Sequence, residues 1–204
     1  MNTLFIDLGG VLVSLQIEKA LKAYLSFSGV SEEAVQSLLQ KRDPQDLCNR
    51  YEKGLIEKTG FYRSVAGFLG LEITPEEFER IWNSMIGPAV PGMEAALRGL
   101  KAAGRAEIHL LSNTNPGHYG YVCENEPWIP ELCDGVHLSY EMGLLKPDPA
   151  FYEAVLRQSG GVSRTEVLFV DDTAANLETA RALGLQTHLF ISSDAMMAQV
   201  QVLC

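Results

Sequence analysis

The sequence has no cluster of basic residues. Its 204 residues include 16 Lys and Arg against 26 Asp and Glu, which gives a formal net charge of −10 and a pI of about 4.8. Nucleic acids and anionic membranes are recognised through basic patches, so this balance argues against both as partners. An anionic substrate would have to be attracted locally, by a metal ion or a lysine.

Also absent are a long apolar run and a close pair of cysteines. Asp7 interrupts the apolar N-terminus, no basic segment precedes it, and a membrane-spanning helix needs about 20 apolar residues. We therefore expect neither a signal peptide nor a spanning helix. The cysteines lie scattered without C-x-x-C spacing: Cys48, Cys123, Cys133 and Cys204. This favours reduced thiols and a cytoplasmic location.

The chain contains no repeat and no low-complexity tract. Its hydrophobic share of 47% is enough to bury a substantial core over this length. These properties favour one α/β domain, or one core that carries a smaller insert.

The first predicted strand ends in a carboxylate followed by two glycines. Residues 4–6 form an apolar run typical of a parallel strand buried on both faces. Asp7 then stands at the carboxyl end of a central strand, where open α/β sheets bind ligands. Gly9 and Gly10 let the backbone turn sharply and approach a ligand. The alternative is a core strand that merely ends in Asp-Leu-Gly-Gly.

Residues 15–90 show helical periodicity and no convincing strand. Start signals include Ser31 as an N-cap and a capping box that begins at Thr74, while residues 51–57 interrupt the pattern. We expect about four helices here. From Pro91 onward, helices and strands alternate, as in a parallel sheet with right-handed crossovers. The expected strands are 108–111, 136–139, 167–170 and 187–191, and the expected helices are 93–103, 150–158 and 174–183.

Three further stretches follow the Asp7 segment in an order that builds one site: residues 110–115 (LLSNTN), 143–149 (GLLKPDP) and 167–176 (VLFVDDTAAN). Together the four stretches closely resemble the haloacid dehalogenase-like (HAD) hydrolase superfamily, in particular its small phosphatases. The resemblance implies an α/β core of residues 1–14 and 91–204, with a Rossmann-like parallel sheet of order 3-2-1-4-5. It also implies that residues 15–90 form a helical cap, which closes over the active site and selects the substrate. The alternative is that these helices only cover one face of the sheet.

The resemblance assigns roles to the acidic residues. Asp7 is the nucleophile that attacks a phosphoryl group and carries it as an aspartyl-phosphate, and Mg²⁺ is bound by Asp7, the Gly9 carbonyl and Asp172. Asp171 is a possible further ligand, although it and Asn176 are expected rather to support the ligands. From the residues alone, Asp7 could be purely a metal ligand and Asp172 could be a helix N-cap.

Three other residues are predicted to hold the phosphoryl group. The Ser112 hydroxyl and the Asn113 backbone N–H follow a strand end, where the resemblance implies phosphate oxygens; taken alone, a Ser-Asn pair indicates no more than a turn. Lys146 precedes Pro147 and belongs to the family's third motif. We expect Lys146 to bind the phosphate and to neutralise charge on the transferring oxygens.

Gly9 departs from the most common phosphatase pattern of the family. The second residue after the nucleophile is usually an Asp that serves as general acid and base, and losing a positioned acid costs about 10²- to 10⁴-fold in rate. The four motifs as they stand here resemble the bacterial α-D-glucose-1-phosphate phosphatases, whose anomeric leaving group departs more easily than a simple alcohol. Otherwise, the cap or water would have to supply the acid.

These observations predict a Mg²⁺-dependent phosphomonoesterase for a small phosphorylated metabolite, such as glucose 1-phosphate or another sugar phosphate. One rival is a 2-haloacid dehalogenase-type hydrolase, in which Asp7 attacks carbon. Another is a non-catalytic regulator that only binds a phosphorylated ligand, because Gly9 replaces the usual acid. The sequence leaves the exact substrate, the general acid and the oligomeric state open. Candidates for substrate contacts in the cap are Arg42, Asp43, Arg50, Tyr51 and Glu52.

Overall fold

The central sheet is built from strands that are buried on both faces. In β1, Leu4 and Ile6 pack on one face and Phe5 on the other, all with 0% exposure. The computed structural model describes residues 3–203. The strands of the sheet are β1 (Thr3–Ile6), β4 (Glu107–Ser112), β5 (Gly135–Leu138), β6 (Val167–Asp171) and β7 (Gln186–Leu189).

All strand pairs in this sheet are parallel, and the spatial order is β5-β4-β1-β6-β7. Counted along the chain, this is the order 3-2-1-4-5, so the prediction is confirmed. Successive strands are added on one side of β1 first and then on the other. The carboxyl end of β1 is therefore the topological switch point, where such sheets form a ligand-binding crevice.

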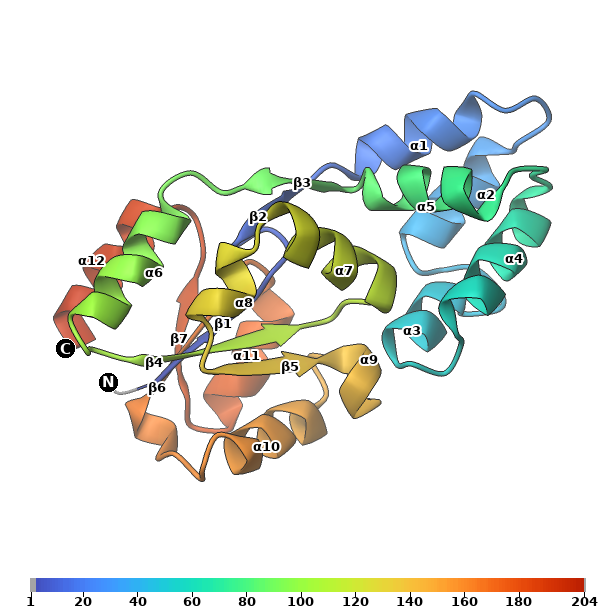
Figure 1. The fold of residues 1–204 in the computed structure, drawn as a ribbon. Coiled ribbons are helices and arrows are strands. Elements are labelled where there is room, and N and C mark those ends of the chain that lie inside the picture. The colour runs from blue at the N-terminus through green and yellow to red at the C-terminus, as the bar shows by residue number, and fades with distance from the viewer. Residues whose placement is uncertain (1–2, 204) are drawn as a thin grey trace.

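Helices cover both faces of the sheet and make a three-layer α/β fold (Figure 1). The face of Leu4 and Ile6 is covered by α6 (Met93–Ala102), α7 (Pro116–Asn125), α8 (Trp128–Leu132) and α12 (Ser193–Leu203). The face of Phe5 is covered by α10 (Pro149–Gln158) and α11 (Ala174–Ala182). A short helix α9 (Ser139–Met142) and a 3₁₀ turn η1 (Arg164–Glu166) lie in the connections.

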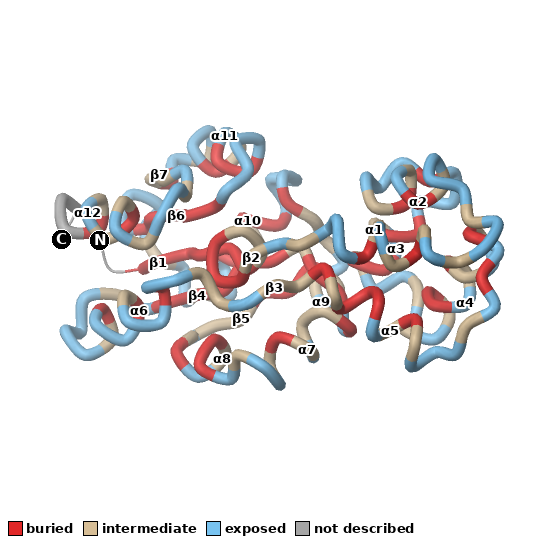
Figure 2. The backbone as a smooth tube through the Cα atoms, turned by 90° about the horizontal axis from the view of Figure 1, so that it is seen from above, coloured by how far each residue is buried: buried red, intermediate tan, exposed pale blue. Residues whose placement is uncertain are grey.

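Five helices form a separate lobe with a core of its own. They are α1 (Ile17–Leu25), α2 (Glu32–Leu39), α3 (Leu47–Glu52), α4 (Lys58–Leu69) and α5 (Pro75–Asn83), and we call them the helical lobe. Aromatic rings fill its centre: Phe61 stacks on Tyr51 with centroids 4.2 Å apart and meets Trp82 edge to face at 4.9 Å. Figure 2 shows the helical lobe beside the sheet, with buried segments on the inside of each.

Two chain crossings connect the helical lobe to the sheet, and they pair with each other. β2 (Val13–Leu15) and β3 (Ile86–Ala89) form an antiparallel ribbon. The prediction that residues 15–90 contain no strand is therefore wrong for β3. Its sequence Ile-Gly-Pro-Ala has no alternating pattern, and Gly and Pro are unfavourable in strands, so only the pairing with β2 reveals it.

Side-chain caps account for two of the predicted helix starts. The Ser31 hydroxyl accepts a hydrogen bond from the Ala34 N–H, and the Thr74 hydroxyl accepts one from the Glu77 N–H. The break predicted for residues 51–57 is wrong at its start, because α3 extends to Glu52. Helices α7, α8 and α12 lie where no helix is predicted.

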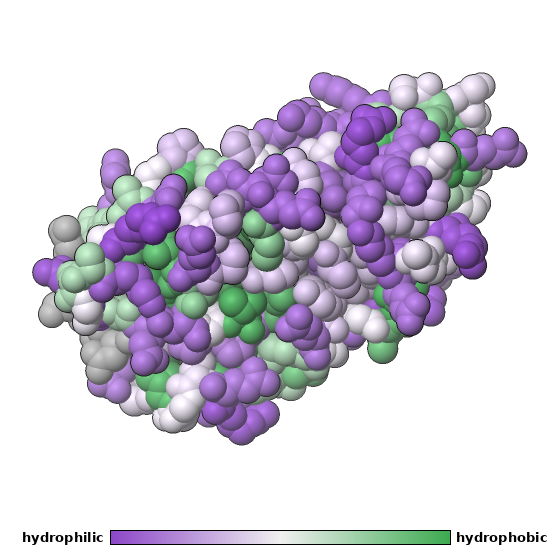
Figure 3. Space-filling view, viewed as in Figure 1, coloured by the Kyte–Doolittle hydropathy of each residue, from purple (hydrophilic) through white to green (hydrophobic). Residues whose placement is uncertain are grey.

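On the face of the molecule shown in Figure 3, hydrophilic side chains are spread over both the sheet and the helical lobe, with small apolar patches between them. Among residues 3–203, no helix combines the length and the apolar character that crossing a membrane requires. Leu15 and Ile17 are large apolar side chains that are nevertheless 48% and 45% exposed. Both lie where the ribbon enters the helical lobe, next to the site described below.

Candidate active site

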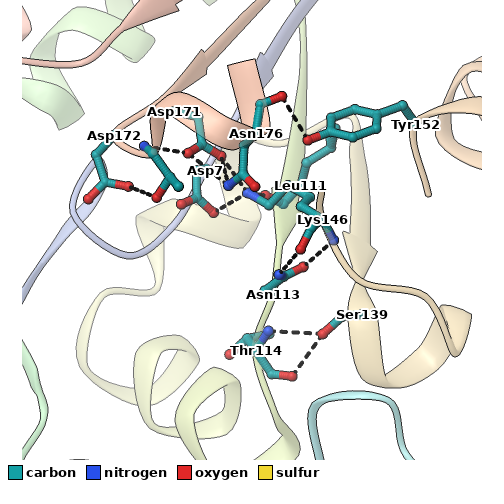
Figure 4. Close-up of polar contacts among 11 residues, drawn as sticks. Asp7, Leu111, Asn113, Thr114, Ser139, Lys146, Tyr152, Asp171, Asp172 and Asn176 are labelled. Atoms are coloured by element: carbon teal, nitrogen blue, oxygen red, sulfur yellow. Dashed lines mark hydrogen bonds and ion pairs between the residues drawn. The ribbon is translucent and has the colours of Figure 1, made fainter. Parts of the chain in front are cut away.

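Lys146 lies at the centre of the site, with its side chain only 1% exposed. Its ammonium group contacts Asp7 Oδ1 at 2.8 Å, Asp171 Oδ2 at 2.7 Å and the Leu111 carbonyl at 2.9 Å (Figure 4). An ammonium group has three N–H donors, so each of them has an acceptor. Lys146 thereby ties together the ends of β1, β4 and β6.

The register of the sheet brings these acceptors to one level. Ile6 pairs with Leu110 of β4 and with Val170 of β6. The residues that follow these three positions are Asp7, Leu111 and Asp171, and they therefore stand side by side at the end of the sheet. The carboxyl ends of three parallel strands thus present three oxygen atoms to one side chain. This is the arrangement that the strand-end positions of Asp7 and Asp171 predict.

Asn113 holds the backbone of Lys146 through two reciprocal hydrogen bonds. The Asn113 side-chain amide donates to the Lys146 carbonyl, and the Lys146 N–H donates to Asn113 Oδ1, both at 2.8 Å. Ser139 fixes the same turn, because its hydroxyl donates to the Thr114 carbonyl and accepts from the Thr114 N–H, both at 3.0 Å. The side chain of Asn113 is therefore occupied in positioning Lys146.

Burial and charge together set the protonation of this cluster. Burial raises the pKa of Asp7 to about 6, although Lys146 lowers it, and Asp171 raises it further. Burial lowers the pKa of Lys146, but Asp7 and Asp171 more than offset this and hold it above its usual value. Lys146 is therefore charged at neutral pH, and two carboxylates share one positive charge.

The adjacent residues Asp171 and Asp172 have different surroundings. Asp171 is fully buried and accepts hydrogen bonds from Lys146, the Thr173 N–H and the Asn176 amide, all between 2.7 and 3.0 Å. Asp172 is exposed, and its Oδ1 accepts a hydrogen bond from the Thr173 hydroxyl at 3.2 Å. Burial and Asp171 raise the pKa of Asp172. Protein groups thus satisfy Asp171, whereas the Asp172 carboxylate is exposed at the wall of the cavity described below.

Gly10 allows Asp172 to approach the Asp7 loop. Its φ of +78° lies in the left-handed region, and a Cβ on it would stand 2.1 Å from Asp172 Oδ2. Any other residue would be strained there and would push the carboxylate away. The second glycine of the Asp7 segment is therefore required by backbone conformation and by space.

The three carboxylates can supply oxygen atoms to one cation. Asp7, Asp171 and Asp172 each offer one oxygen within 4.8 Å of the other two. Hard oxygen donors in small number suit Mg²⁺, which keeps several of its waters. Because Asp171 already accepts several hydrogen bonds, Asp7 and Asp172 are the more available donors.

A cavity of about 460 Å³ opens beside this cluster, between the sheet and the helical lobe. The predicted site residues on its wall are Asp7, Gly9, Ser112, Asn113, Lys146 and Asp172. The helical lobe contributes Lys41 and Glu52, among others. Of the five lobe residues that are sequence candidates for substrate contacts, only Glu52 lines the cavity. The volume lies within the range of about 300 to 1,000 Å³ that ligand pockets occupy.

Gly9 is a different kind of glycine from Gly10. Its φ lies outside the left-handed region, and a Cβ on it would meet the Leu15 side chain at 3.2 Å. Leu15 is half-exposed and belongs to the ribbon, so it can yield by a few tenths of an ångström. The backbone at Gly9 thus accepts a side chain, and Leu15 occupies the neighbouring space.

The contact between α5 and α7 joins the helical lobe to the core, and no sequence pattern predicts it. The His118 ring stacks on Trp82 at 5.0 Å, and its Nε2–H donates to the Trp82 carbonyl at 3.1 Å. The Asn115 amide donates to His118 Nδ1 at 3.1 Å. Burial lowers the pKa of His118 to about 4, which fits this neutral tautomer. His118 also lines the cavity.

Comparison with known proteins identifies relatives of this chain. A family model described as haloacid dehalogenase-like hydrolase matches residues 1–184. A D-ribitol-5-phosphate phosphatase of Bacteroides thetaiotaomicron is 28% identical over 193 residues, 92% of this chain and 90% of that protein. A sesquiterpene phosphatase of Aspergillus oryzae is 32% identical over 139 residues, 67% of this chain and 68% of that one. A solved HAD family enzyme of B. thetaiotaomicron, in complex with magnesium and inorganic phosphate, matches with a TM-score of 0.82 and 28% identity, covering 94% of this chain and 95% of that one.

Replacing Lys146 by Met should strongly destabilise the protein, because two buried carboxylates lose their counter-charge. Breaking a buried ion pair in this way costs about 3–5 kcal/mol. The pKa of Asp7, already raised to about 6, should rise further without the ammonium group. The folded variant then binds more protons than the unaltered protein, so its stability deficit should shrink from pH 8 to pH 5. Urea unfolding at both pH values measures this.

Arg98→Met is the matched control, because the Arg98–Glu94 pair is exposed and follows the i, i+4 spacing. Such pairs contribute about 0.3–0.5 kcal/mol. If Lys146→Met cost no more than Arg98→Met, the buried cluster would not depend on its ammonium group.

Proposed function

The chain belongs to the haloacid dehalogenase-like hydrolases, and from this membership we propose that it is a Mg²⁺-dependent phosphomonoesterase for a small phosphorylated metabolite. Its substrate in this proposal is a sugar or polyol phosphate, of which glucose 1-phosphate is one candidate. The phosphatases among its relatives, and the relative that binds magnesium and phosphate, support this proposal. The free thiols Cys48, Cys123 and Cys133 are consistent with a cytoplasmic location.

The observation that carries the proposal is the position of Asp7. Lys146 holds Asp7 Oδ1, and the Asp7 side chain stands on the cavity wall with 12% exposure. A carboxylate fixed by one oxygen in this way is aimed into the cavity and protected from solvent elsewhere. This is the geometry that a nucleophile needs, because the reacting atoms must be held near attack distance.

In the proposed reaction, a carboxylate oxygen of Asp7 forms a bond to phosphorus while the bond from phosphorus to the ester oxygen breaks. The leaving oxygen takes up a proton, and water then hydrolyses the aspartyl-phosphate to release inorganic phosphate and restore Asp7. Ser112 and the Asn113 N–H bind the phosphoryl oxygens, and the charge of Lys146 stabilises the transition state. Mg²⁺, bound through Asp7, the Gly9 carbonyl and Asp172, would neutralise further negative charge on those oxygens.

The two rival functions predict different products. A dehalogenase releases halide and has no need of a cation, whereas Asp172 offers a carboxylate that such a reaction leaves unused. A non-catalytic regulator would bind a phosphorylated ligand without releasing phosphate. A metabolite panel tested with and without Mg²⁺, beside halide release from a 2-haloacid, separates all three.

Asp7→Asn should abolish phosphate release, by about 10³-fold or more, because the amide keeps the shape but cannot act as the nucleophile. The fold should persist, since Lys146 keeps Asp171 and the Leu111 carbonyl as partners. Phosphate release and thermal unfolding are measured on the same preparations. Substantial turnover by a folded Asp7→Asn variant would contradict the covalent mechanism.

Asp172→Ala should weaken Mg²⁺ binding by about tenfold or more and leave stability within about 1 kcal/mol, because Asp172 is exposed. Asp171→Ala should instead destabilise the fold, because Lys146 and Asn176 lose a buried partner. Calorimetric Mg²⁺ titration and urea unfolding of both variants test this. The assignment within the doublet is wrong if Asp171→Ala loses the cation while Asp172→Ala keeps it.

Gly9→Asp should help simple alkyl phosphates more than sugar 1-phosphates, because an added carboxyl group can protonate the poorer leaving group. The ratio of their kcat/KM values should narrow, each tenfold change corresponding to about 1.4 kcal/mol. Gly9→Ala is the control for the displacement of Leu15. If the two variants behave alike on every substrate, the missing side chain does not limit this enzyme.

A further inference from the structure

Lys41 occupies a backbone position that suits glycine. Helix α2 ends in a Schellman motif, in which the Arg42 N–H donates to the Ser37 carbonyl and the Lys41 N–H to the Leu38 carbonyl. This motif puts Lys41 at φ +55°, in the left-handed region. The other described non-glycine residue with positive φ is Asp46, and Asp tolerates this conformation whereas Lys does not gain from it. A non-glycine residue in this region is uncommon, so the contacts of the Lys41 side chain bear on what this part of the cavity can bind.

That side chain meets Glu52 on the wall of the cavity. Lys41 Nζ contacts Glu52 Oε2 at 2.7 Å, with the Lys41 side chain 40% exposed and that of Glu52 11% exposed. Both residues line the cavity that also contains Asp7. Of the described residues, they are the charged ones that the helical lobe contributes to this wall, and Leu39, Trp82 and Met85 beside them are apolar or aromatic. Lys41 and the buried Glu52 thus form a polar patch on the wall of the cavity that also contains Asp7.

We propose that Lys41 and Glu52 bind hydroxyl groups of the substrate's leaving group, so that the enzyme prefers monophosphates of polyhydroxylated alcohols. This inference rests on the proposed function. A hydroxyl group both donates and accepts hydrogen bonds, and an ammonium beside a carboxylate offers both N–H donors and oxygen acceptors. Neighbouring hydroxyls can therefore bind both partners without breaking their contact.

The charges argue against a second anionic group as the ligand. Glu52 neutralises Lys41 at 2.7 Å, so the pair offers no net positive charge to a further phosphate or carboxylate. The apolar neighbours suit the C–H faces of a sugar or polyol. Of the described residues, Lys41 and Glu52 are the charged ones that the helical lobe contributes to the cavity wall, so their contact would select among monophosphates by the hydroxyl groups of the leaving group.

The test compares a pentitol 5-phosphate with n-pentyl phosphate, which has the same chain length and no hydroxyl groups. Dissociation constants are measured by calorimetry in Mg²⁺ buffer on the Asp7→Asn background, where turnover plays no part. We expect the background protein to prefer the pentitol ester at least tenfold. Lys41→Met and Glu52→Gln should each reduce this preference about tenfold, which is 1.4 kcal/mol. Lys58→Met is the matched control, because the Lys58–Glu79 pair lies in the helical lobe away from the cavity wall, and it should leave the preference unchanged.

The responses of the two esters separate recognition from a purely structural ion pair. A structural role predicts that Lys41→Met and Glu52→Gln weaken the binding of both esters equally, whereas recognition predicts that they weaken chiefly the binding of the pentitol ester. Thermal unfolding of every variant identifies any that do not fold, and Glu52→Gln is the mildest change. The inference is overturned if the background protein binds both esters equally, or if the single variants weaken both esters equally. Phosphate release by the unaltered protein is assayed separately, so loss of the proposed function is told apart from loss of this recognition.

Discussion

A single buried ammonium group is the constraint on which the site depends. A charge with 1% exposure is costly unless it is paired, and Lys146 finds its partners only where three strand ends stand level. A slip of one residue in β1 or β6 would turn a carboxylate to the other face of the sheet and leave the ammonium group unpaired. The contact that secures the register of the sheet is thus the same contact that orients Asp7.

The ribbon gives the helical lobe a direct influence on the chemistry. Leu15 lies in β2 and fills the space beside Gly9, within 3.2 Å of where a side chain would begin. Any movement of the helical lobe about the ribbon therefore changes what surrounds Gly9, two residues after Asp7. In this protein, the Leu15 side chain occupies the space that a side chain at position 9 would need.

The sequence predicts most of the sheet because its strands are short apolar runs that end in polar residues. It brings Asp7 and Asp171 together because the carboxyl ends of parallel strands meet at one edge, whereas only the family resemblance places Lys146 beside them. It cannot distinguish the surroundings of Asp171 and Asp172, because these depend on the direction of two successive side chains. Helix α7 is also hidden, since its two glycines and its mixed residues give no clear apolar face.

Lys41 illustrates a further limit of sequence reading. Its left-handed backbone follows from how α2 ends, and a lysine at that position gives no local signal of a turn. Glu52 is visible as a charged residue, but its burial depends on α3, which lies partly in a predicted break. Contacts between elements of the helical lobe determine the backbone conformation of Lys41 and the burial of Glu52, and local sequence patterns do not reveal such contacts.

The stacking of Trp82 on His118 has an optical consequence. The chain contains two tryptophans, and they lie on opposite sides of the ribbon: Trp82 in the helical lobe and Trp128 in the core. Trp82 touches the core through a histidine ring, whereas Trp128 donates to Glu126 within the core itself. A separation of the two bodies would change the environment of one indole and leave the other as an internal reference. The molecule thus carries its own fluorescence reporter of the distance between its parts.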